Sequence, residues 1–371
     1  MADSQAQRIR VVFAAGGTAG HVEPALATAD MIQRIEPRAH ISFLATATGI
    51  ENQLVPPRGY DLLMVPKAAI PRGISKDLIL LPIKLLRAVA QTKKAIAGAD
   101  VVIGFGGYLA GAAYIAAKIS GIPIVVHEAN AKAGLANQLG ALFATEVALC
   151  ESINGISKGR VIGLPMRESI VNWATDVRSD AKKFRTEARL ALGISPSMQT
   201  LVVMGGSQGS LRINSAIADA LDLILGKEIQ VIHAVGGRNE LPGKKVGYFP
   251  SQYLTKMELV YAAADLLIAR SGAATCQEVL AFGLPTIFIP LPHGNGEQGL
   301  NARPIAQVGA AIVIPDDQTT GEKLAAEVID LIKDEAKLSE MHKASGQLAH
   351  LDSAKRLAEL VITVARAKSK K

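Results

Sequence analysis

The chain has 371 residues, of which 49% are hydrophobic, 20% are charged and only 4% are aromatic. This length exceeds what one ordinary hydrophobic core organises, so two domains are expected, and the hydrophobic fraction excludes a disordered chain. The formal net charge of +7 favours anionic partners, namely nucleic acid, anionic lipid or phosphorylated substrates, and does not choose among them.

The first unit of the chain is residues 9–32, IRVVFAAGGTAGHVEPALATADMI, which predicts a buried strand, a glycine turn and a helix. Backbone N–H groups at a helix start can bind phosphate, and glycines let the phosphate approach. The turn lacks the G-x-G-x-x-G spacing of NAD sites, and no G-x-x-x-x-G-K-[ST] run exists. We therefore expect phosphate binding, with a plain tight turn as the alternative. His21, directly after the turn, is a candidate general base or a structural histidine.

A basic, amphipathic segment follows at residues 74–94, ISKDLILLPIKLLRAVAQTKK. Such a segment can lie in a bilayer interface and attract anionic lipid, whereas the alternative is a helix packed into the N-terminal core. No stretch has the ~20 apolar residues that cross a bilayer. The candidate membrane contacts are Ile74, Leu78, Ile79, Leu81, Ile83, Lys84 and Arg87.

The next unit, residues 100–130, predicts strand, glycine turn, Ala-rich helix, Gly-Ile-Pro and strand. His127 ends the last strand, where a structural role is expected. The sequence GLPMR at residues 163–167 marks a domain boundary, and its Arg167 could clamp a phosphate through two hydrogen bonds. The two cysteines, Cys150 and Cys276, are far apart in sequence and have no metal-ligand spacing.

The second half repeats the first. Residues 200–221 again predict a strand, a Gly-Gly-Ser-x-Gly turn and a helix, and residues 265–292 repeat the strand, turn, helix, Gly-x-Pro, strand order. This duplication predicts an α/β fold of two Rossmann-like, doubly wound parallel-sheet domains whose loops face a cleft. We expect domains at 1–165 and 166–345, and a helical tail at 346–371 that packs back on the N-terminal domain. Glu278, early in a predicted helix, could accept hydrogen bonds from ribose hydroxyls or simply stabilise the helix dipole.

Seven motifs in order resemble the family of bacterial GlcNAc transferases that convert lipid I to lipid II in peptidoglycan synthesis. They are GGTAGHVEPALA at residue 16, GFGGYLAG at 104, HEANAKAGLANQLGA at 127, GLPMR at 163, GGSQGSLRIN at 205, RSGAATCQEVLAFGLP at 270 and PHGNGEQGLNA at 292. The resemblance runs almost end to end. It implies a GT-B fold and inverting transfer of GlcNAc from UDP-GlcNAc to the MurNAc 4-hydroxyl of undecaprenyl-diphosphate-linked muramyl pentapeptide.

The resemblance also implies site residues. His21 is the candidate catalytic base, and Arg167 with the helix starts at Ser207 and Ala273 would stabilise the departing UDP, so we expect no metal ion and no cofactor. The implied UDP-GlcNAc contacts are Thr18, Ala19, Gly20, Asn130, Arg167, Ser207, Leu254, Ala273, Ala274, Thr275, Cys276, Gln277, Glu278 and Gln298.

Three positions depart from the common family pattern. Ala19 replaces a glycine, which is tolerated only if its φ is negative. Ala129 stands where a glutamine is usual, and Glu297 replaces the first of two glutamines, putting a carboxylate near a sugar.

The expected partners are UDP-GlcNAc, lipid I and an anionic membrane surface, with cell-wall or division proteins as further candidates and no nucleic acid. The expected location is the cytoplasmic face of the cell membrane, as a peripheral protein. Three alternatives remain open: a UDP-GlcNAc 2-epimerase, another UDP-sugar transferase, and a non-catalytic sugar-nucleotide-binding scaffold for cell-wall assembly.

Overall fold

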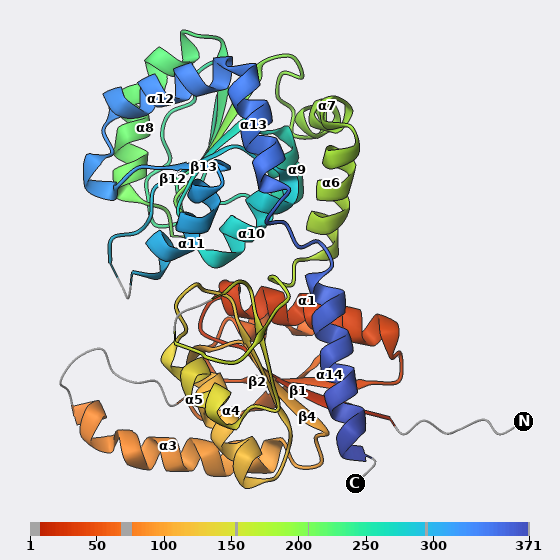
Figure 1. Ribbon diagram of the computed structural model, residues 1–371. Helices are drawn as coiled ribbons and strands as arrows, with labels where there is room; N and C mark the ends of the chain where they lie inside the picture. Colours follow the sequence, from red (N-terminus) through yellow and green to blue (C-terminus); the bar gives the residue numbers. More distant parts are fainter. Residues whose placement is uncertain (1–7, 68–75, 153–154, 207, 294–295, 370–371) are drawn as a thin grey trace, which may run out of the picture. The chain divides into compact units, whose positions relative to one another are not determined.

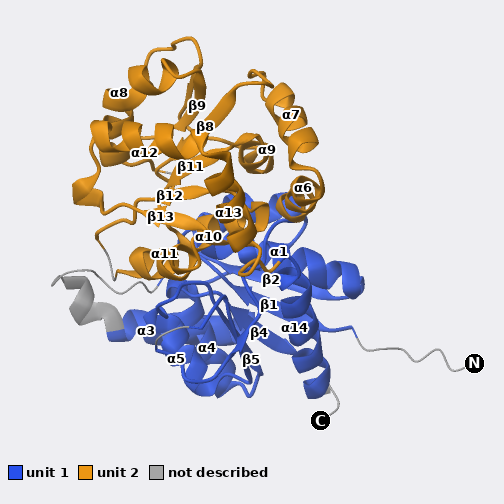
Figure 2. Cartoon of the chain, turned by 45° about the horizontal axis from the view of Figure 1, so that its top comes forward, with its two compact units in different colours: residues 1–167, 351–371 blue, residues 168–350 orange. Residues whose placement is uncertain are grey.

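A computed structural model describes residues 8–67, 76–152, 155–206, 208–293 and 296–369; of residues 76–81 and 369 only the backbone is described. The chain forms two compact units, residues 1–167 with 351–371 and residues 168–350 (Figure 2). The first boundary thus lies two residues beyond the expected one, and the second lies five residues beyond it. The predicted cleft between two domains stays a prediction.

Unit 1 is built on a seven-stranded parallel sheet (Figure 1). Its strand order is β3-β2-β1-β4-β5-β6-β7, so the chain reverses its direction of winding between β1 and β4. Loops at the carboxyl ends of two such strands diverge and leave room for a ligand. The strands are β1 (Arg10–Ala14), β2 (His40–Ala45), β3 (Asp61–Met64), β4 (Val101–Gly104), β5 (Ile124–Glu128), β6 (Glu146–Leu149) and β7 (Arg160–Val161).

Helices cover both faces of this sheet because alternate strand residues point to opposite faces. Val11 and Phe13 belong to the core that α1 and α14 cover, whereas Val12 and Ala14 belong to the core beneath α3 and α4. The C-terminal helix α14 packs beside α1 and completes unit 1 (Figure 1). The helices are α1 (Ala19–Ile35), α2 (Glu51–Leu54), the 3-10 helix η1 (Pro56–Arg58), α3 (Lys76–Ala95), α4 (Gly107–Ile119), α5 (Leu135–Phe143) and α14 (Ser353–Ser369).

Unit 2 is built the same way on a six-stranded parallel sheet of order β10-β9-β8-β11-β12-β13. Its direction of winding reverses between β8 and β11. The strands are β8 (Gln199–Met204), β9 (Ile229–Ala234), β10 (Tyr248–Ser251), β11 (Leu266–Ala269), β12 (Thr286–Phe288) and β13 (Ala311–Val313). The duplication seen in the sequence is therefore a duplication of this fold, and the prediction of two Rossmann-like parallel-sheet domains is confirmed.

The helices of unit 2 include α8 and α12, which pack together over the core that contains Leu201, Val203 and Ile268. Helices α6, α7, α9 and α10 form a second packed group. The bounds are α6 (Glu168–Ser179), α7 (Ala181–Ala191), α8 (Leu211–Leu225), α9 (Met257–Ala263), α10 (Ala273–Phe282), α11 (Glu297–Gln307), η2 (Asp316–Gln318), α12 (Gly321–Lys333) and α13 (Glu335–Ser345).

Candidate functional site

The first glycine turn of unit 1 connects β1 to α1. Gly17 has φ +96°, which only glycine adopts without strain, and Thr18 is the extended N-cap of α1. Ala19 and Gly20 open the helix, whose first turn carries no acidic residue. Glu228 is the one non-glycine residue with positive φ in the described part of the chain, so the departure at Ala19 causes no backbone strain. The turn therefore presents helix-start amides, and the first turn of the helix adds no acidic side chain of its own.

His21 is half-buried in the first turn of α1. Its Nδ1 lies 3.2 Å from the carbonyl oxygen of Gly16 and 3.3 Å from Thr18 Oγ1. A carbonyl oxygen only accepts, so the neutral ring that satisfies it carries its proton on Nδ1 and its lone pair on Nε2. That tautomer is the one a general base acting through Nε2 requires.

The second glycine turn of unit 1, at Gly106 and Gly107, packs directly on the first. Both residues have positive φ, +90° and +76°. A Cβ on Gly107 would lie 2.5 Å from the Gly16 carbonyl oxygen, and a Cβ on Gly106 would lie 3.6 Å from His21 Nε2. The two glycine turns therefore pack against each other, and the start of α4 lies beside the carbonyl oxygen that orients His21.

A buried carboxylate organises the loop that contains Asn130. Glu128 is 3% exposed, and its Oε1 accepts from the Asn130 backbone N–H at 2.9 Å. Its Oε2 accepts from the Gly134 N–H and from Asn137 Nδ2, both at 3.0 Å. Tyr114 Oη in turn donates to Asn137 Oδ1 at 2.7 Å. Our sequence reasoning missed Glu128, although a charged residue ending an apolar strand was a usable signal.

His127 holds the turn that precedes Arg167. The imidazole is completely buried, and burial lowers its pKa. Its Nε2 lies 3.0 Å from the carbonyl oxygen of Gly163, to which the neutral ring donates. Arg167 follows four residues later and is half-exposed. The structural role expected for His127 is therefore to fix the GLPMR turn.

A second group that the sequence did not reveal lies beside the first glycine turn. The Tyr108 ring faces Gly17, and Tyr108 Oη lies 3.0 Å from Thr46 Oγ1. Burial raises the pKa of this phenol. Glu51 is completely buried and accepts hydrogen bonds from Thr46 through its Oε1, from N at 3.0 Å and from Oγ1 at 3.2 Å. Glu51 stands in a polar loop of the sequence, where no pattern marks it as buried.

In unit 2, the glycine turn after β8 is enclosed by neighbouring loops. The position predicted at Ser207 lies outside the described residues. A Cβ on Gly209 would lie 1.9 Å from the Val235 carbonyl oxygen, which also accepts from Asn214 Nδ2 at 2.9 Å. His233 links Asn214 to the phenol of Tyr248 through its two ring nitrogens, at 3.1 and 2.9 Å.

Arg270 ties this turn to two other loops of unit 2. Its Nη2 donates to Ser210 Oγ at 2.6 Å, and Ser210 is the N-cap of α8. Its Nη1 donates to the Ile289 carbonyl oxygen at 2.9 Å and lies 2.5 Å from Asp316 Oδ1. Arg270 is 9% exposed. Its buried guanidinium thus connects the turn to the segments that contain Ile289 and Asp316.

The α10 segment carries six of the predicted donor contacts. Ala273, Ala274 and Thr275 form its first turn, where backbone N–H groups have no helical acceptor. The N–H of Cys276 already donates to Gly272 O at 2.9 Å, and Cys276 and Gln277 are buried, at 2% and 7% exposure. Glu278 is half-buried and accepts from Tyr261 Oη at 2.8 Å.

Two further predicted contacts follow two other strands of unit 2, β12 and β10. Gln298 is in the first turn of α11. Its Oε1 accepts from the Leu291 N–H at 3.0 Å, so its amide NH₂ group points away from that N–H. Leu254 follows β10 and is half-exposed. The half-buried Glu297 opens α11.

The structure therefore gathers the predicted residues into two sets at carboxyl ends of strands. In unit 1 they follow β1, β5 and β7, and in unit 2 they follow β10, β11 and β12. Within the described ranges, no group of three or more His, Cys, Asp or Glu side chains is arranged to hold a metal ion.

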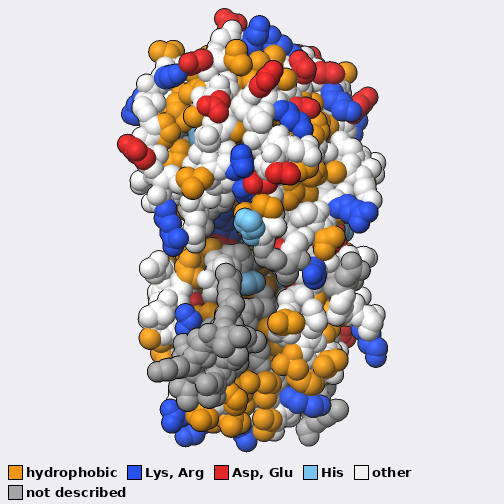
Figure 3. Space-filling model, turned by 90° about the vertical axis from the view of Figure 1, so that its left-hand side faces the viewer, with side chains coloured by type: hydrophobic (Ala, Val, Ile, Leu, Met, Phe, Trp, Pro, Cys, Tyr) orange, Lys and Arg blue, Asp and Glu red, His pale blue; other side chains and the backbone are white. Residues whose placement is uncertain are grey.

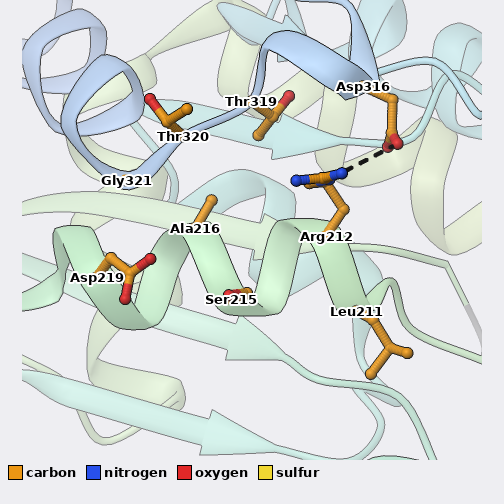
Figure 4. A pocket seen from close by; sticks show the side chains of 9 residues that line it. All are labelled: Leu211, Arg212, Ser215, Ala216, Asp219, Asp316, Thr319, Thr320 and Gly321. Carbon is orange, nitrogen blue, oxygen red and sulfur yellow. Dashed lines mark ion pairs between the residues drawn. The ribbon is translucent and has the colours of Figure 1, made fainter.

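A cavity of about 560 Å³ in unit 2 lies apart from these residues. It opens between α8 and the start of α12, and the Arg212 guanidinium reaches across it toward Asp316 at 4.0 Å (Figure 4). The residues that line it are Leu211, Arg212, Ser215, Ala216, Asp219, Asp316, Thr319, Thr320 and Gly321, and none is a predicted donor contact.

The helix α3 lies on an apolar and basic face of unit 1. Ile83 and Leu86 are 52% and 70% exposed, and Lys84 and Arg87 beside them are exposed. Helices α3, α4 and α5 pack side by side, and α5 adds the exposed Leu142. Figure 3 shows hydrophobic side chains together with Lys and Arg side chains on this surface of unit 1. Ile74 and the side chains of Leu78, Ile79 and Leu81 lie outside the described residues. Across the described chain, no helix is both long and apolar enough to span a membrane.

Comparison with known proteins places these features in one family. The glycosyltransferase family 28 N-terminal domain matches residues 11–149, and its C-terminal domain matches residues 200–358. A Saccharopolyspora erythraea protein named UDP-N-acetylglucosamine–N-acetylmuramyl-(pentapeptide) pyrophosphoryl-undecaprenol N-acetylglucosamine transferase is 45% identical over 371 residues, covering 98% of this chain and 96% of that protein.

Two solved structures show the same fold. The crystal structure of Acinetobacter baumannii MurG matches with a TM-score of 0.74 and 27% identity, covering 96% of this chain and 99% of that one. A Neisseria meningitidis UDP-GlcNAc 2-epimerase bound to UDP-GlcNAc matches with a TM-score of 0.66 over 96% and 100% of the two chains. At 11% identity, the second match is a likeness of fold alone.

Proposed function

Because the chain belongs to glycosyltransferase family 28, and within it to the transferases that move GlcNAc onto N-acetylmuramyl-(pentapeptide) pyrophosphoryl-undecaprenol, we propose that it makes lipid II from lipid I. It is a hexosyltransferase with a GT-B fold. Its donor is UDP-GlcNAc, its acceptor is the MurNAc 4-hydroxyl of lipid I, and the transfer inverts the anomeric centre.

The orientation of His21 is the single observation that carries the catalytic part of the proposal. An inverting transfer needs a base that removes the proton of the acceptor hydroxyl as the new glycosidic bond forms. With Nδ1 donating to Gly16 O, the ring offers Nε2 as that base. The proton moves from the 4-hydroxyl to Nε2, the hydroxyl oxygen attacks the anomeric carbon, and the bond to UDP breaks.

The departing UDP gains negative charge, which helix-start amides and Arg167 would stabilise. The first turn of α10 supplies amides in unit 2, and the start of α1 supplies amides in unit 1. In this proposal Glu278 accepts hydrogen bonds from the ribose hydroxyls, and Leu254 and Gln298 contact uracil and sugar. The helix dipoles and the Arg167 guanidinium would stabilise the negative charge of the departing UDP, so the proposal requires no metal ion.

The apolar and basic face of α3 supports a peripheral position on an anionic membrane. Ile83 and Leu86 can enter the acyl boundary while Lys84 and Arg87 meet lipid phosphates. The acceptor carries an undecaprenyl chain, so binding at the cytoplasmic face of the cell membrane would place the enzyme beside it. An association with cell-wall or division proteins stays a prediction.

The test is transfer of labelled GlcNAc from UDP-GlcNAc to a lipid I analogue by the purified protein. Formation of the disaccharide product with release of UDP is expected. Release of ManNAc without acceptor would instead identify a 2-epimerase, and tight UDP-GlcNAc binding with no turnover in the presence of acceptor would identify a scaffold. The 45% identity to a named transferase over nearly the whole chain favours the first outcome.

A further inference from the structure

A buried phenol is bonded to the carboxylate that we assign to the ribose. Tyr261 lies in α9 and is 2% exposed, and its Oη donates to Glu278 Oε2 at 2.8 Å. The ring packs against Phe282 with centroids 5.5 Å apart. Burying a hydroxyl is costly unless it is hydrogen-bonded, and the Glu278 carboxylate supplies a hydrogen-bond acceptor for this phenol.

The bond restricts the geometry of Glu278. A glutamate has three rotatable side-chain bonds, and the last is broad in its preferred angles. A donor held at Oε2 by the packing of its own ring restricts the orientation of the carboxylate plane. The phenol comes from α9 whereas the carboxylate comes from α10, so the packing of two helices determines where the carboxylate points.

We propose that Tyr261 is a positioning residue that presents the Glu278 carboxylate to the donor ribose and so sets the preference for ribonucleotide over 2′-deoxyribonucleotide. The inference rests on the role proposed above for Glu278.

The chemistry of the group points to ribose rather than to other parts of the donor. An ionised carboxylate only accepts hydrogen bonds and has about four acceptor positions, so one phenol donor is compatible with donation from hydroxyls. The two ribose hydroxyls are donors, whereas the diphosphate is anionic and would be repelled. A site built to bond a hydroxyl discriminates against the analogue that lacks it.

The experiment compares binding of UDP and 2′-deoxy-UDP to the full-length protein by calorimetry. The wild type is expected to bind UDP more tightly. Tyr261→Phe keeps the ring and its contact with Phe282, and should lower this preference by about threefold to tenfold, mainly through weaker UDP binding. Its kcat at saturating UDP-GlcNAc should stay within about twofold, because the phenol does not touch the reacting atoms.

Two variants separate the explanations. Tyr248→Phe removes another buried phenol of unit 2, one bonded to His233 Nδ1 at 2.9 Å, and should leave the UDP to 2′-deoxy-UDP ratio unchanged. Glu278→Gln should abolish the preference. If Tyr261→Phe weakens both nucleotides equally, its role is structural and the inference is overturned. If the wild type shows no preference, or Glu278→Gln retains it, the ribose role in the proposed function is wrong instead.

Discussion

At the scale of single residues, His21 carries the most direct prediction. Replacing His21 with alanine removes the proposed base but leaves the amides of the glycine turn in place. We expect kcat to fall by about 10²- to 10⁴-fold, while the Kd for UDP-GlcNAc changes by less than about threefold. Steady-state kinetics with a lipid I analogue and calorimetry with the donor measure the two quantities.

The matched control for this change is His40→Ala. His40 begins β2, at the amino end of a strand in the same parallel sheet, and should be dispensable for turnover. Full kcat in the His21 variant would show that another group, or water, takes the proton.

His233 gives a prediction about stability and pH. Burial lowers its pKa from 6.5 to about 4. Between these values the unfolded chain binds a proton that the folded protein does not, so stability rises with pH there and is lost as pH falls. This single group should reduce the free energy of unfolding by about 2 kcal/mol between pH 7 and pH 5.

The measurement is urea unfolding of wild type and His233→Gln at both pH values. The glutamine does not titrate. Between pH 7 and pH 5 the free energy of unfolding should therefore fall by about 2 kcal/mol less in the variant than in the wild type, although the variant is less stable at pH 7. The contribution of buried His127 is common to both proteins and cancels in the difference. An equal pH dependence in both would mean that His233 is not held neutral.

Residues of one kind were accessible to sequence reasoning and residues of another were not. Thr18, His21 and Glu278 stand in or beside glycine turns, and a turn between strand and helix has a recognisable chemistry. Tyr261 acts on Glu278 from another helix, and this contact exists only once α9 and α10 pack together. Periodicity carries no information about such pairs.

At the scale of elements, the contact between the two glycine turns of unit 1 can be tested. Gly107→Ala would place a Cβ 2.5 Å from Gly16 O at a φ of +76°. Gly121→Ala is the control, because it has a similar φ of +63° but no heavy atom within 4 Å of the added Cβ. The control should lose about 1–2 kcal/mol of stability from backbone strain alone.

The Gly107 variant should lose a further 1–3 kcal/mol or so, since α4 or the first turn must move. Movement of Gly16 O would also disturb the proton position on His21, so kcat should fall at least about tenfold, whereas Gly121→Ala should retain activity. Thermal unfolding and the transfer assay measure both effects. Equal behaviour of the two variants would show that the close approach has no functional consequence.

The helix α3 makes a prediction about membrane binding. Ile83→Glu with Leu86→Glu places charge on the exposed apolar face without touching the predicted donor contacts. Binding to vesicles with anionic lipid should weaken at least about tenfold, because burial of each side chain in the acyl boundary is worth about 1.5–3 kcal/mol. Sedimentation with vesicles at several salt concentrations measures it.

The control for that experiment is Leu223→Glu, since Leu223 is 57% exposed on α8 of unit 2. Turnover with a short-chain, water-soluble acceptor should be unchanged in both proteins. Unaltered vesicle binding in the α3 variant would remove the membrane role from this helix.

At the scale of the whole molecule, the repeated order of strand, glycine turn and helix was sufficient to predict two parallel-sheet units. The hydrophobic periodicity of each segment distinguishes a strand from a helix. Right-handed crossover connections then leave few possible arrangements of the strands and helices. The exact ends of the units were less accessible. Residues 346–350 were expected in the tail, yet they belong to unit 2, because a loop of mixed polarity does not show on which core it packs.

The C-terminal helix α14 gives the last prediction. Leu357, Ala358, Val361, Ile362 and Ala365 recur at helical spacing and are buried against the core that α1 covers. Deleting residues 351–371 would expose that core. Losing several such side chains costs roughly 5–10 kcal/mol, which is comparable with the whole stability of a domain.

The deletion should therefore unfold unit 1 and leave unit 2 folded. The sequence offers a probe for this, because its one tryptophan, Trp173, lies in α6 of unit 2 and packs against Phe184. In the shortened protein the Trp173 fluorescence should still show a cooperative unfolding transition, while far-UV circular dichroism at 25 °C loses about half of its helical signal. Loss of both signals together would mean that unit 2 depends on unit 1 for its stability. Retention of both signals would mean that the core of unit 1 folds without α14.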